Sequence, residues 1–317
     1  GVEIDTTADL TITGQGYYYQ FGSSISIEGD LNGDGYDDLV VSAPMDDYDA
    51  RGRVYIYFGG EEMDSECDVY LEGKEPFDSF GGTLSVIGDV NGDGYDDLLV
   101  GAPQTLAENK PGKAYLFFGG DEIGFENSLE FIGDENTYDY GMFLSGLGDI
   151  NGDGFNDFGI ASFEYVDIFL GSQKMDDINS VCQFSGEFSF IGTLRDINKD
   201  NYSDYVIVQR DIGIHYGEEE IDAVSDITLN FWANPVVNLG DINGDNKDEI
   251  AFGIGGGWDP NGRVEIYTYT GLSSAEDGNE KFPIAFQLNN NYPNPFNSQT
   301  RISFTITEGS KVEVTIY

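Results

Sequence analysis

The stretch Asp30-Leu31-Asn32-Gly33-Asp34-Gly35-Tyr36-Asp37-Asp38 decides how this chain folds, and an apolar run from Leu39 to Val41 follows it directly. Oxygen-bearing side chains occupy its first, third, fifth and ninth positions, and glycines occupy the fourth and sixth, where a tight loop needs positive φ. Alternate side chains then point inward, and the backbone carbonyl of the seventh residue completes a shell of oxygen atoms. Oxygen ligands that include several carboxylates suit Ca²⁺, so the stretch predicts a calcium site.

The same pattern occurs five times, and we name these segments acidic loops 1 to 5: residues 30–38, 89–97, 149–157, 196–204 and 241–249. Loop 4 has Asn201 in place of the second glycine, and loop 5 ends in Glu249. Such a recurrence is the signature of a repeat architecture and predicts up to five Ca²⁺ ions. The expected ligands are Asp30, Asn32, Asp34, Tyr36 and Asp38; Asp89, Asn91, Asp93, Tyr95 and Asp97; Asp149, Asn151, Asp153, Phe155 and Asp157; Asp196, Asn198, Asp200, Tyr202 and Asp204; and Asp241, Asn243, Asp245, Lys247 and Glu249.

Two other interpretations of the loops compete with this one. An EF-hand needs a bidentate Glu at its twelfth position, but that position of loop 1 is Val41, and the flanking residues favour strands over helices. A polar Asn/Asp/Gly turn without metal is the second alternative, and it has most weight for loops 4 and 5.

The charge balance excludes two classes of partner. The chain has 14 basic and 59 acidic residues, a formal net charge of -45, so its field repels nucleic acid and anionic membrane surfaces. No apolar run is long enough to span a bilayer, so we expect no membrane insertion.

Cys67 and Cys182 fall in outer strands of different repeats, so we expect no disulfide between them because of the distance. Residue 1 is Gly, as expected if a leader peptide has been removed.

Each loop lies inside a larger unit of four apolar stretches. In the first unit these are Ile25–Ile27, Leu39–Pro44, Arg53–Phe58 and Val69–Gly73. The second stretch of each unit is continuously apolar, which is typical of a strand covered on both faces, whereas the third and fourth alternate. Four-stranded units repeated radially predict an all-β fold, a five-bladed β-propeller over residues 1–270.

The fourth strand of the fifth blade has no counterpart before residue 271. Leu10-Thr-Ile-Thr-Gly14 is a strand of the same type that stands alone ahead of the first unit, so we predict that this N-terminal strand completes the fifth blade and closes the ring. The alternative is that the five units form part of a larger ring completed by another chain.

The motifs resemble FG-GAP repeats, as in the propeller of the integrin α subunit. The resemblance rests on the Phe-Gly pairs at 21–22 and 80–81, the acidic loops, and Ala-Pro at 43–44 and 102–103, and it covers residues from about 10 to 270. It implies Ca²⁺ in hairpin loops on one rim and a protein or glycan partner on the opposite rim. Integrin propellers have seven blades, whereas this chain has five repeats.

The C-terminal part has a different composition. Residues 271–281 are predicted to be a linker, and residues 282–317 a short β segment with strands at 301–306 and 311–317. Asn291-Tyr-Pro-Asn-Pro-Phe-Asn297 resembles the start of the C-terminal sorting domain of type IX secretion cargo, which implies export to the surface of a Gram-negative bacterium. Two strands alone are not independently stable, so self-assembly through residues 282–317 is a further possibility.

Catalysis finds little support in the sequence, and we expect no catalytic residue and no organic cofactor. His215 is the single histidine and is interpreted as a sheet residue. Aromatic residues occur in the connections opposite the loops, where they could anchor a partner. For Tyr140 and Trp232 we favour packing between blades over exposure. The full set is the aromatic residues Tyr17, Tyr18, Tyr19, Tyr48, Phe77, Tyr138, Tyr140, Trp232 and Trp258, together with Met45.

The sequence therefore predicts a secreted, non-catalytic, calcium-stabilised propeller that acts as a surface adhesion or interaction module. The alternatives are a structural subunit of an extracellular assembly or filament, joined through its C-terminal strands, and a carbohydrate-binding or enzyme-associated module.

Overall fold

The computed structural model describes residues 8–14, 20–27, 29–45, 50–103, 110–135, 137–175, 178–256 and 259–269, together with the backbone of three later strands. Apart from one 3₁₀ turn, η1 (Phe125–Asn127), the regular elements are strands. They form five four-stranded antiparallel sheets, each made of consecutive strands, and one two-stranded sheet. The all-β class and the four-stranded repeat are confirmed.

The strands of the first three sheets follow the apolar stretches expected from the sequence. The first sheet comprises β1 (Ile25–Ser26), β2 (Leu39–Ala43), β3 (Arg53–Tyr57) and β4 (Val69–Glu72); the second β5 (Thr83–Gly88), β6 (Asp97–Ala102), β7 (Lys113–Phe117) and β8 (Ser128–Ile132); the third β9 (Phe143–Gly148), β10 (Asp157–Ala161), β11 (Tyr165–Phe169) and β12 (Cys182–Ser185).

The last two four-stranded sheets have the same order. The fourth comprises β13 (Phe190–Arg195), β14 (Asp204–Val208), β15 (Ile212–His215) and β16 (Ile227–Leu229), and the fifth comprises β17 (Val236–Gly240), β18 (Glu249–Gly256), β19 (Asp259–Thr268) and β20 (Phe286–Gln287).

The second strand of each unit is deeply covered. Every residue of β6, β10 and β14 is buried, whereas the outer strand β4 alternates between exposed and covered positions. Continuous apolar sequence therefore marks a strand with a neighbouring sheet on each face, as expected. Cys67 and Cys182 are both free, which confirms that they do not form a disulfide with each other.

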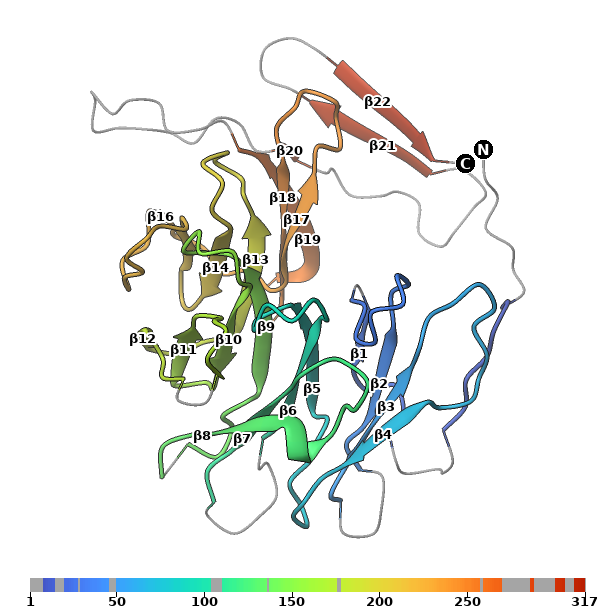
Figure 1. The fold of residues 1–317 in the computed structure, drawn as a ribbon. Coiled ribbons are helices and arrows are strands. Elements are labelled where there is room, and N and C mark those ends of the chain that lie inside the picture. The colour runs from blue at the N-terminus through green and yellow to red at the C-terminus, as the bar shows by residue number, and fades with distance from the viewer. Residues whose placement is uncertain are drawn as a thin grey trace.

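The five sheets stand side by side as an arc of propeller blades, with their first strands toward the centre (Figure 1). Contacts between these inner strands run in chain order, from β1 to β5, β9, β13 and β17. Three clusters of buried apolar side chains lie between the sheets and hold them together: one joins sheets 1 and 2, one joins sheets 2, 3 and 4, and one joins sheets 4 and 5.

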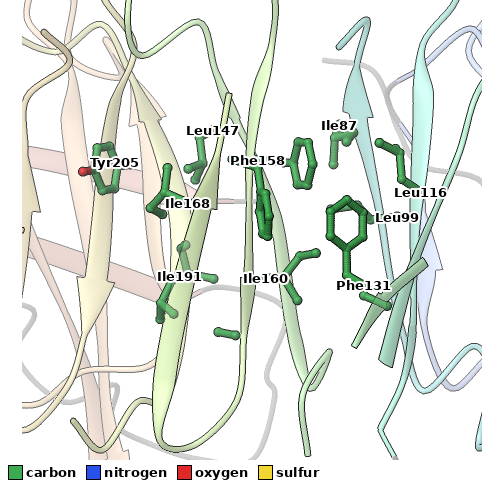
Figure 2. Close-up of a cluster of buried hydrophobic side chains, with 14 of the residues drawn as sticks. Ile87, Leu99, Leu116, Phe131, Leu147, Phe158, Ile160, Ile168, Ile191 and Tyr205 are labelled. Atoms are coloured by element: carbon green, nitrogen blue, oxygen red, sulfur yellow. The ribbon is translucent and has the colours of Figure 1, made fainter. Parts of the chain in front are cut away.

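Figure 2 shows the largest of these clusters, in which side chains from three sheets interdigitate. Phe158 of β10 stacks on Phe169 with ring centroids 5.1 Å apart, and Phe131 of β8 meets Phe169 edge-on at 4.8 Å. Ile191 and Tyr205 of the fourth sheet extend the same cluster. No sheet buries its own faces, so each blade is stable through its neighbours.

The prediction that Leu10–Gly14 closes the ring is wrong. These residues form no strand, and β20 provides the fourth strand of the fifth sheet by pairing Phe286 with Ile266. A Cβ added at Gly14 would lie 2.4 Å from the Cβ of Phe21, so this segment runs beside the first sheet. The edge of β19 is taken by a strand from downstream.

The C-terminal β segment contains the expected hairpin, β21 (Thr300–Thr305) and β22 (Lys311–Ile316), which confirms the two predicted strands. The predicted linker and the Asn291–Asn297 motif lie outside the described residues. The fifth sheet thus takes one strand from the segment that the sequence assigned to the appendage.

Close backbone approach between blades makes one glycine critical. Gly52 has φ of 86°, and a Cβ added there would lie 2.0 Å from the carbonyl oxygen of Phe80 in the next blade. Gly22 has φ of 84° with nothing within 4 Å of an added Cβ, so it is a matched control. We expect Gly22→Ala to cost about 1 kcal/mol from backbone strain, and Gly52→Ala about 2 kcal/mol more from overpacking. Urea denaturation of both variants checks this, and equal losses would contradict it.

Candidate metal-binding rim

All five acidic loops join the first strand of a sheet to the second, so they lie on the same rim of the arc. In the first sheet the loop connects β1 to β2, whose pairing of Ile25 with Val41 sets the hairpin. The repeat places each loop at the same point of its blade, as the sequence predicted.

Each loop is wound around the carboxylate of its first residue. In loop 1, Asp30 Oδ1 accepts hydrogen bonds from the backbone N–H groups of Gly33 (2.7 Å) and Asp34 (3.0 Å), and Oδ2 accepts one from Gly35 (2.7 Å). Asn32 Oδ1 then accepts the N–H of Asp34, and Asp34 Oδ1 accepts the N–H of Tyr36. The oxygen-bearing side chains at alternate positions therefore point into the loop, as expected for a cation shell.

The other loops repeat this geometry. In each, the first carboxylate accepts the N–H groups of the fifth and sixth residues, at 2.8 to 3.2 Å. The sixth residue has positive φ in every loop, including Asn201 (75°) and Asn246 (65°) in loops 4 and 5. Asn tolerates this left-handed conformation better than most residues, which explains how the degenerate loops keep the fold of the glycine-rich ones.

The ninth residue ties each loop to the sheet. Asp97 is fully buried, and its Oδ2 accepts the N–H of Val90 (2.9 Å) while its Oδ1 accepts the N–H of Gly119 (2.9 Å). Asp38, Asp157 and Asp204 make the same pair of bonds in loops 1, 3 and 4. These aspartates therefore fix the loop to the end of the third strand, a structural role that the sequence pattern did not predict.

Loop 5 differs from the other four. In loops 1 to 4 the amide of the third residue donates to the carboxylate of the fifth, as Asn32 does to Asp34 at 3.0 Å. In loop 5, Asn243 donates to Glu249 Oε1 at 2.7 Å. The longer Glu side chain reaches the third residue, so the loop that departs most in sequence also departs in its hydrogen bonding.

The ninth-position carboxylates are held in an unfavourable setting for a negative charge. Burial raises the pKa of Asp97, Asp157 and Asp204 to about 7, and repulsion from the fifth-position carboxylate of each loop acts in the same direction. Hydrogen bonds from backbone N–H groups oppose this rise. A cation in the loop would relieve the repulsion.

The donor atoms fit Ca²⁺ in type and in loop conformation. Loops 1 to 4 each offer three carboxylates and one amide oxygen, and their ligands carry no cationic side chain. The three carboxylates are not gathered into a preformed cluster: within the described residues, no three His, Cys, Asp or Glu side chains are placed to hold a metal ion together. The ninth-position oxygens bond backbone N–H groups, and each has a second lone pair that could face an ion.

Neighbouring loops are hydrogen-bonded to each other along the rim. The N–H of Asp96 in loop 2 donates to the carbonyl of Asp30 in loop 1 (3.0 Å), and the N–H of Asp30 donates to Asp96 Oδ2 (2.9 Å). The N–H groups of Asn156 and Ser203 donate in the same way to the carbonyls of Asp89 and Asp149. The rim is thus a connected series of loops.

The aromatic residues of the opposite rim fall into two groups. Tyr140 is buried and donates its hydroxyl to Asp167 Oδ2 at 2.9 Å, which confirms that it packs between blades. Trp232 is 41% exposed, so the same expectation is wrong for Trp232; the neighbouring Ala233 is the buried residue there. Phe77 and Tyr138 are exposed, as is Phe163, which the sequence analysis missed. The position of Phe163, an aromatic residue in the tight connection of β10 to β11, could have indicated its exposure. Tyr17–Tyr19, Tyr48 and Trp258 lie outside the described residues.

His215 is a packed sheet residue, as interpreted from the sequence. It is 4% exposed, stacks on Tyr205 with centroids 4.9 Å apart, and meets Phe184 edge-on at 5.0 Å. Its Nδ1 has no hydrogen-bond partner, and burial lowers its pKa to about 4, against a raising influence of Asp226 and Asp222.

This buried imidazole predicts a pH effect on stability. The folded pKa of about 4 lies below the ordinary 6.5, so the unfolded chain binds the extra proton between these values. The contribution of His215 to stability is therefore complete above pH 6.5 and is lost as the pH falls toward 4, by on the order of 3 kcal/mol. We expect His215→Phe, which keeps the stacking, to lose less stability than the wild type between pH 7 and pH 4. Identical pH profiles in chemical denaturation would refute this.

Four-stranded blades, a loop rim and Phe-Gly turns define this chain as a repeat protein of the β-propeller class. Residues 21–57 and 80–117 match the family model of the FG-GAP repeat.

The relatives include integrin α chains. Over 211 residues, 61% of this chain and 15% of the relative, the sequence is 31% identical to integrin alpha-PS2 of Drosophila melanogaster. Over 148 residues, 42% of this chain and 17% of the relative, it is 37% identical to the phosphatidylinositol-glycan-specific phospholipase D of Bos taurus. The matches thus span a small part of the length of these relatives. Among solved structures, the exotype rhamnogalacturonan lyase YesX is similar in fold, with a TM-score of 0.51 at 11% identity over 97% of this chain and 57% of the lyase chain.

Proposed function

We propose that this chain is a calcium-stabilised extracellular interaction module, with Ca²⁺ on the rim of the acidic loops and a protein or glycan partner on the opposite rim. The observation that carries the proposal is the fivefold repetition of one loop geometry. Five loops at the same point of five blades wind alternate oxygen-bearing side chains inward around a first carboxylate. The similarity to integrin α chains supports an adhesion or interaction role over catalysis.

Ca²⁺ would be held by the side chains at the first, third, fifth and ninth positions and by the backbone carbonyl of the seventh. Each of loops 1 to 4 supplies three carboxylates, and a bound ion would offset their negative charge. Loop 5 is proposed as the weakest site, because Glu249 and Asn243 bond each other there.

The opposite rim would bind its partner through aromatic side chains. Phe77, Tyr138, Phe163 and Trp232 are 38 to 50% exposed, and all four lie in connections between second and third strands or between neighbouring blades. Exposed aromatic side chains can stack on sugar rings or fill pockets of a protein partner at low entropic cost.

The Asn291–Asn297 motif supports export by type IX secretion and a place at the surface of a Gram-negative bacterium. Within the described residues no helix is long and apolar enough to cross a membrane. Residues 282–317 would then serve sorting. A structural subunit that assembles through these residues is the alternative, and so is a carbohydrate-binding or enzyme-associated module.

Calorimetric titration of the metal-free chain with Ca²⁺ tests the metal proposal. We expect the binding sites of loops 1 to 4 to have similar affinity. Asp93→Ala should remove one of these four sites, whereas Asp245→Ala in loop 5 should leave all four unchanged. Absence of binding heat at millimolar Ca²⁺ would overturn the proposal.

A glycan array and a panel of matrix proteins test the opposite rim. The combined variant Phe77→Ala, Phe163→Ala is expected to lose binding. Tyr70→Ala is the matched control, because Tyr70 is 63% exposed on the outer strand β4, away from that rim. Equal effects of the two variants would refute the assignment of the rim.

A further inference from the structure

The internal blade interfaces share one construction. The second residue of each acidic loop faces the next blade, and in loops 1 to 4 this residue (Leu31, Val90, Ile150 or Ile197) is at most 2% exposed. The apolar residue near the start of the third strand is completely buried in the same four blades. These residues are Val54, Ala114, Val166 and Ile212.

The fifth sheet carries the corresponding residues, and there they are exposed. Ile242, the second residue of loop 5, is 58% exposed, and Val264 in β19 is 47% exposed. Leu239 of β17 is 38% exposed, although its counterparts Leu147 and Leu194 are completely buried. The outer face of the fifth sheet is therefore one half of an interface that is complete four times elsewhere in the chain.

The first sheet presents the other half. In loops 2, 3 and 4 the aromatic seventh residue lies over the first glycine of the preceding loop: a Cβ added at Gly33 would lie 2.6 Å from the Tyr95 ring, and one at Gly92 would lie 2.5 Å from the Phe155 ring. Tyr36 of loop 1 is 43% exposed, and nothing lies within 4 Å of a Cβ added at Gly244 of loop 5.

The Phe-Gly turns give the same result. The Phe80 turn packs on Gly52 of the preceding blade and Phe80 is completely buried, whereas Phe21 of the first blade is half-buried. For Gly262, the counterpart of Gly52 in the fifth blade, the nearest atom of the described residues would lie 3.8 Å from an added Cβ. Ile25 of β1 is 59% exposed, whereas its counterparts Ile191 and Val236 are at most 4% exposed and its counterparts Leu84 and Leu144 are partly buried.

We propose that the outer face of the fifth sheet binds the outer face of the first sheet in a second copy of this chain. Tyr36 of one copy would lie over Gly244 of the other, and the Phe21 turn over Gly262, as Tyr95 lies over Gly33 and the Phe80 turn over Gly52. The interface continues one that the chain already builds four times, and three of those four contain the aromatic ring over a loop glycine.

The occupant is a second copy because each chain carries one of each half, and because the arc holds the two halves apart at its ends (Figure 1). Such a head-to-tail contact is heterologous, so it forms a larger ring if the rotation closes and a filament if it does not. The contact uses neither the C-terminal hairpin nor the opposite rim, and it is independent of the proposed function.

The test uses the full chain and two single-face variants. Val264→Glu places a charge in the fifth-sheet face, Ile25→Glu in the first-sheet face, and Ile132→Glu is the control, because Ile132 is 57% exposed on the outer strand β8. Sedimentation velocity is run with Ca²⁺ and about 0.3 M NaCl, which screens repulsion between chains of charge -45.

We expect the wild type and Ile132→Glu to associate with rising concentration, and each face variant to weaken association at least about tenfold. An equimolar mixture of the two face variants is expected to stop at a heterodimer, because it retains one intact interface. A wild type that stays monomeric at its highest soluble concentration would overturn the proposal, and so would face variants that associate as the wild type does. Failure of the mixture to form a heterodimer would also overturn it.

Discussion

Excess EGTA is expected to lower the melting temperature of this protein by about 15 °C or more. Extracellular modules bind Ca²⁺ with Kd on the order of 10⁻⁴ to 10⁻³ M. With free Ca²⁺ about tenfold above Kd, each site adds about 1.4 kcal/mol to the free energy of unfolding, and five sites add about 7 kcal/mol. For a domain of this size, each 1 kcal/mol shifts the midpoint by about 2 to 4 °C.

The structural reason is the arrangement of carboxylates on one rim. Burial is the largest cause that raises the pKa of Asp97 and Asp157, and repulsion from Asp93 and Asp89 in loop 2 and from Asp153 and Asp149 in loop 3 adds to it. Without a cation these repulsions oppose folding. Because neighbouring loops are hydrogen-bonded to one another, loss of the bound ions weakens the contacts between blades as well.

Calorimetric melting curves in Ca²⁺ and in EGTA check this prediction. Added Mg²⁺ is the control, since Mg²⁺ prefers six-coordinate geometry and gives up its water reluctantly, so it should restore less stability than Ca²⁺. Unchanged melting in EGTA would show that the loops are polar turns without a metal.

The sequence predicted most of the blade architecture because the loop and strand signals are local. The nine-residue pattern fixes a hairpin through its own glycines and its first carboxylate, and the burial of β6 and β10 follows from their apolar sequence. The left-handed conformation at Asn201 is also a local property, because it depends only on the type of residue at the sixth position of the loop.

The features that the sequence did not predict depend on long-range pairing. The fourth strand of the fifth sheet comes from Phe286–Gln287 and not from Leu10–Gly14, because a free strand edge accepts any extended segment within reach. Exposure of Trp232 depends on how its turn meets the neighbouring blade, and the neighbouring Ala233 takes the buried place. The dual bonding of the ninth aspartate needs Gly59, Gly119, Gly171 or Gly217, which stands at the far end of a different strand.

Asp97→Ala is expected to destabilise the chain by about 5 kcal/mol in Ca²⁺, of which about 1.4 kcal/mol is the loss of one calcium site. The buried N–H groups of Val90 and Gly119 both lose their acceptor, and each unsatisfied group costs about 2 kcal/mol. The cost of these two N–H groups should persist in EGTA at about 4 kcal/mol, because both groups remain buried whether or not an ion is present.

Asp93→Ala separates the metal role from the structural one. Asp93 is exposed and accepts hydrogen bonds from the N–H of Tyr95 and the amide of Asn91. In EGTA, Asp93→Ala is therefore expected to lower the free energy of unfolding by no more than about 1 kcal/mol. In Ca²⁺ it should lose about 1.4 kcal/mol more, the contribution of one site. Urea denaturation of both variants in both conditions measures these four differences. If Asp97→Ala were harmless in EGTA, the ninth aspartate would act as a ligand alone, and its two backbone bonds would contribute nothing to the blade.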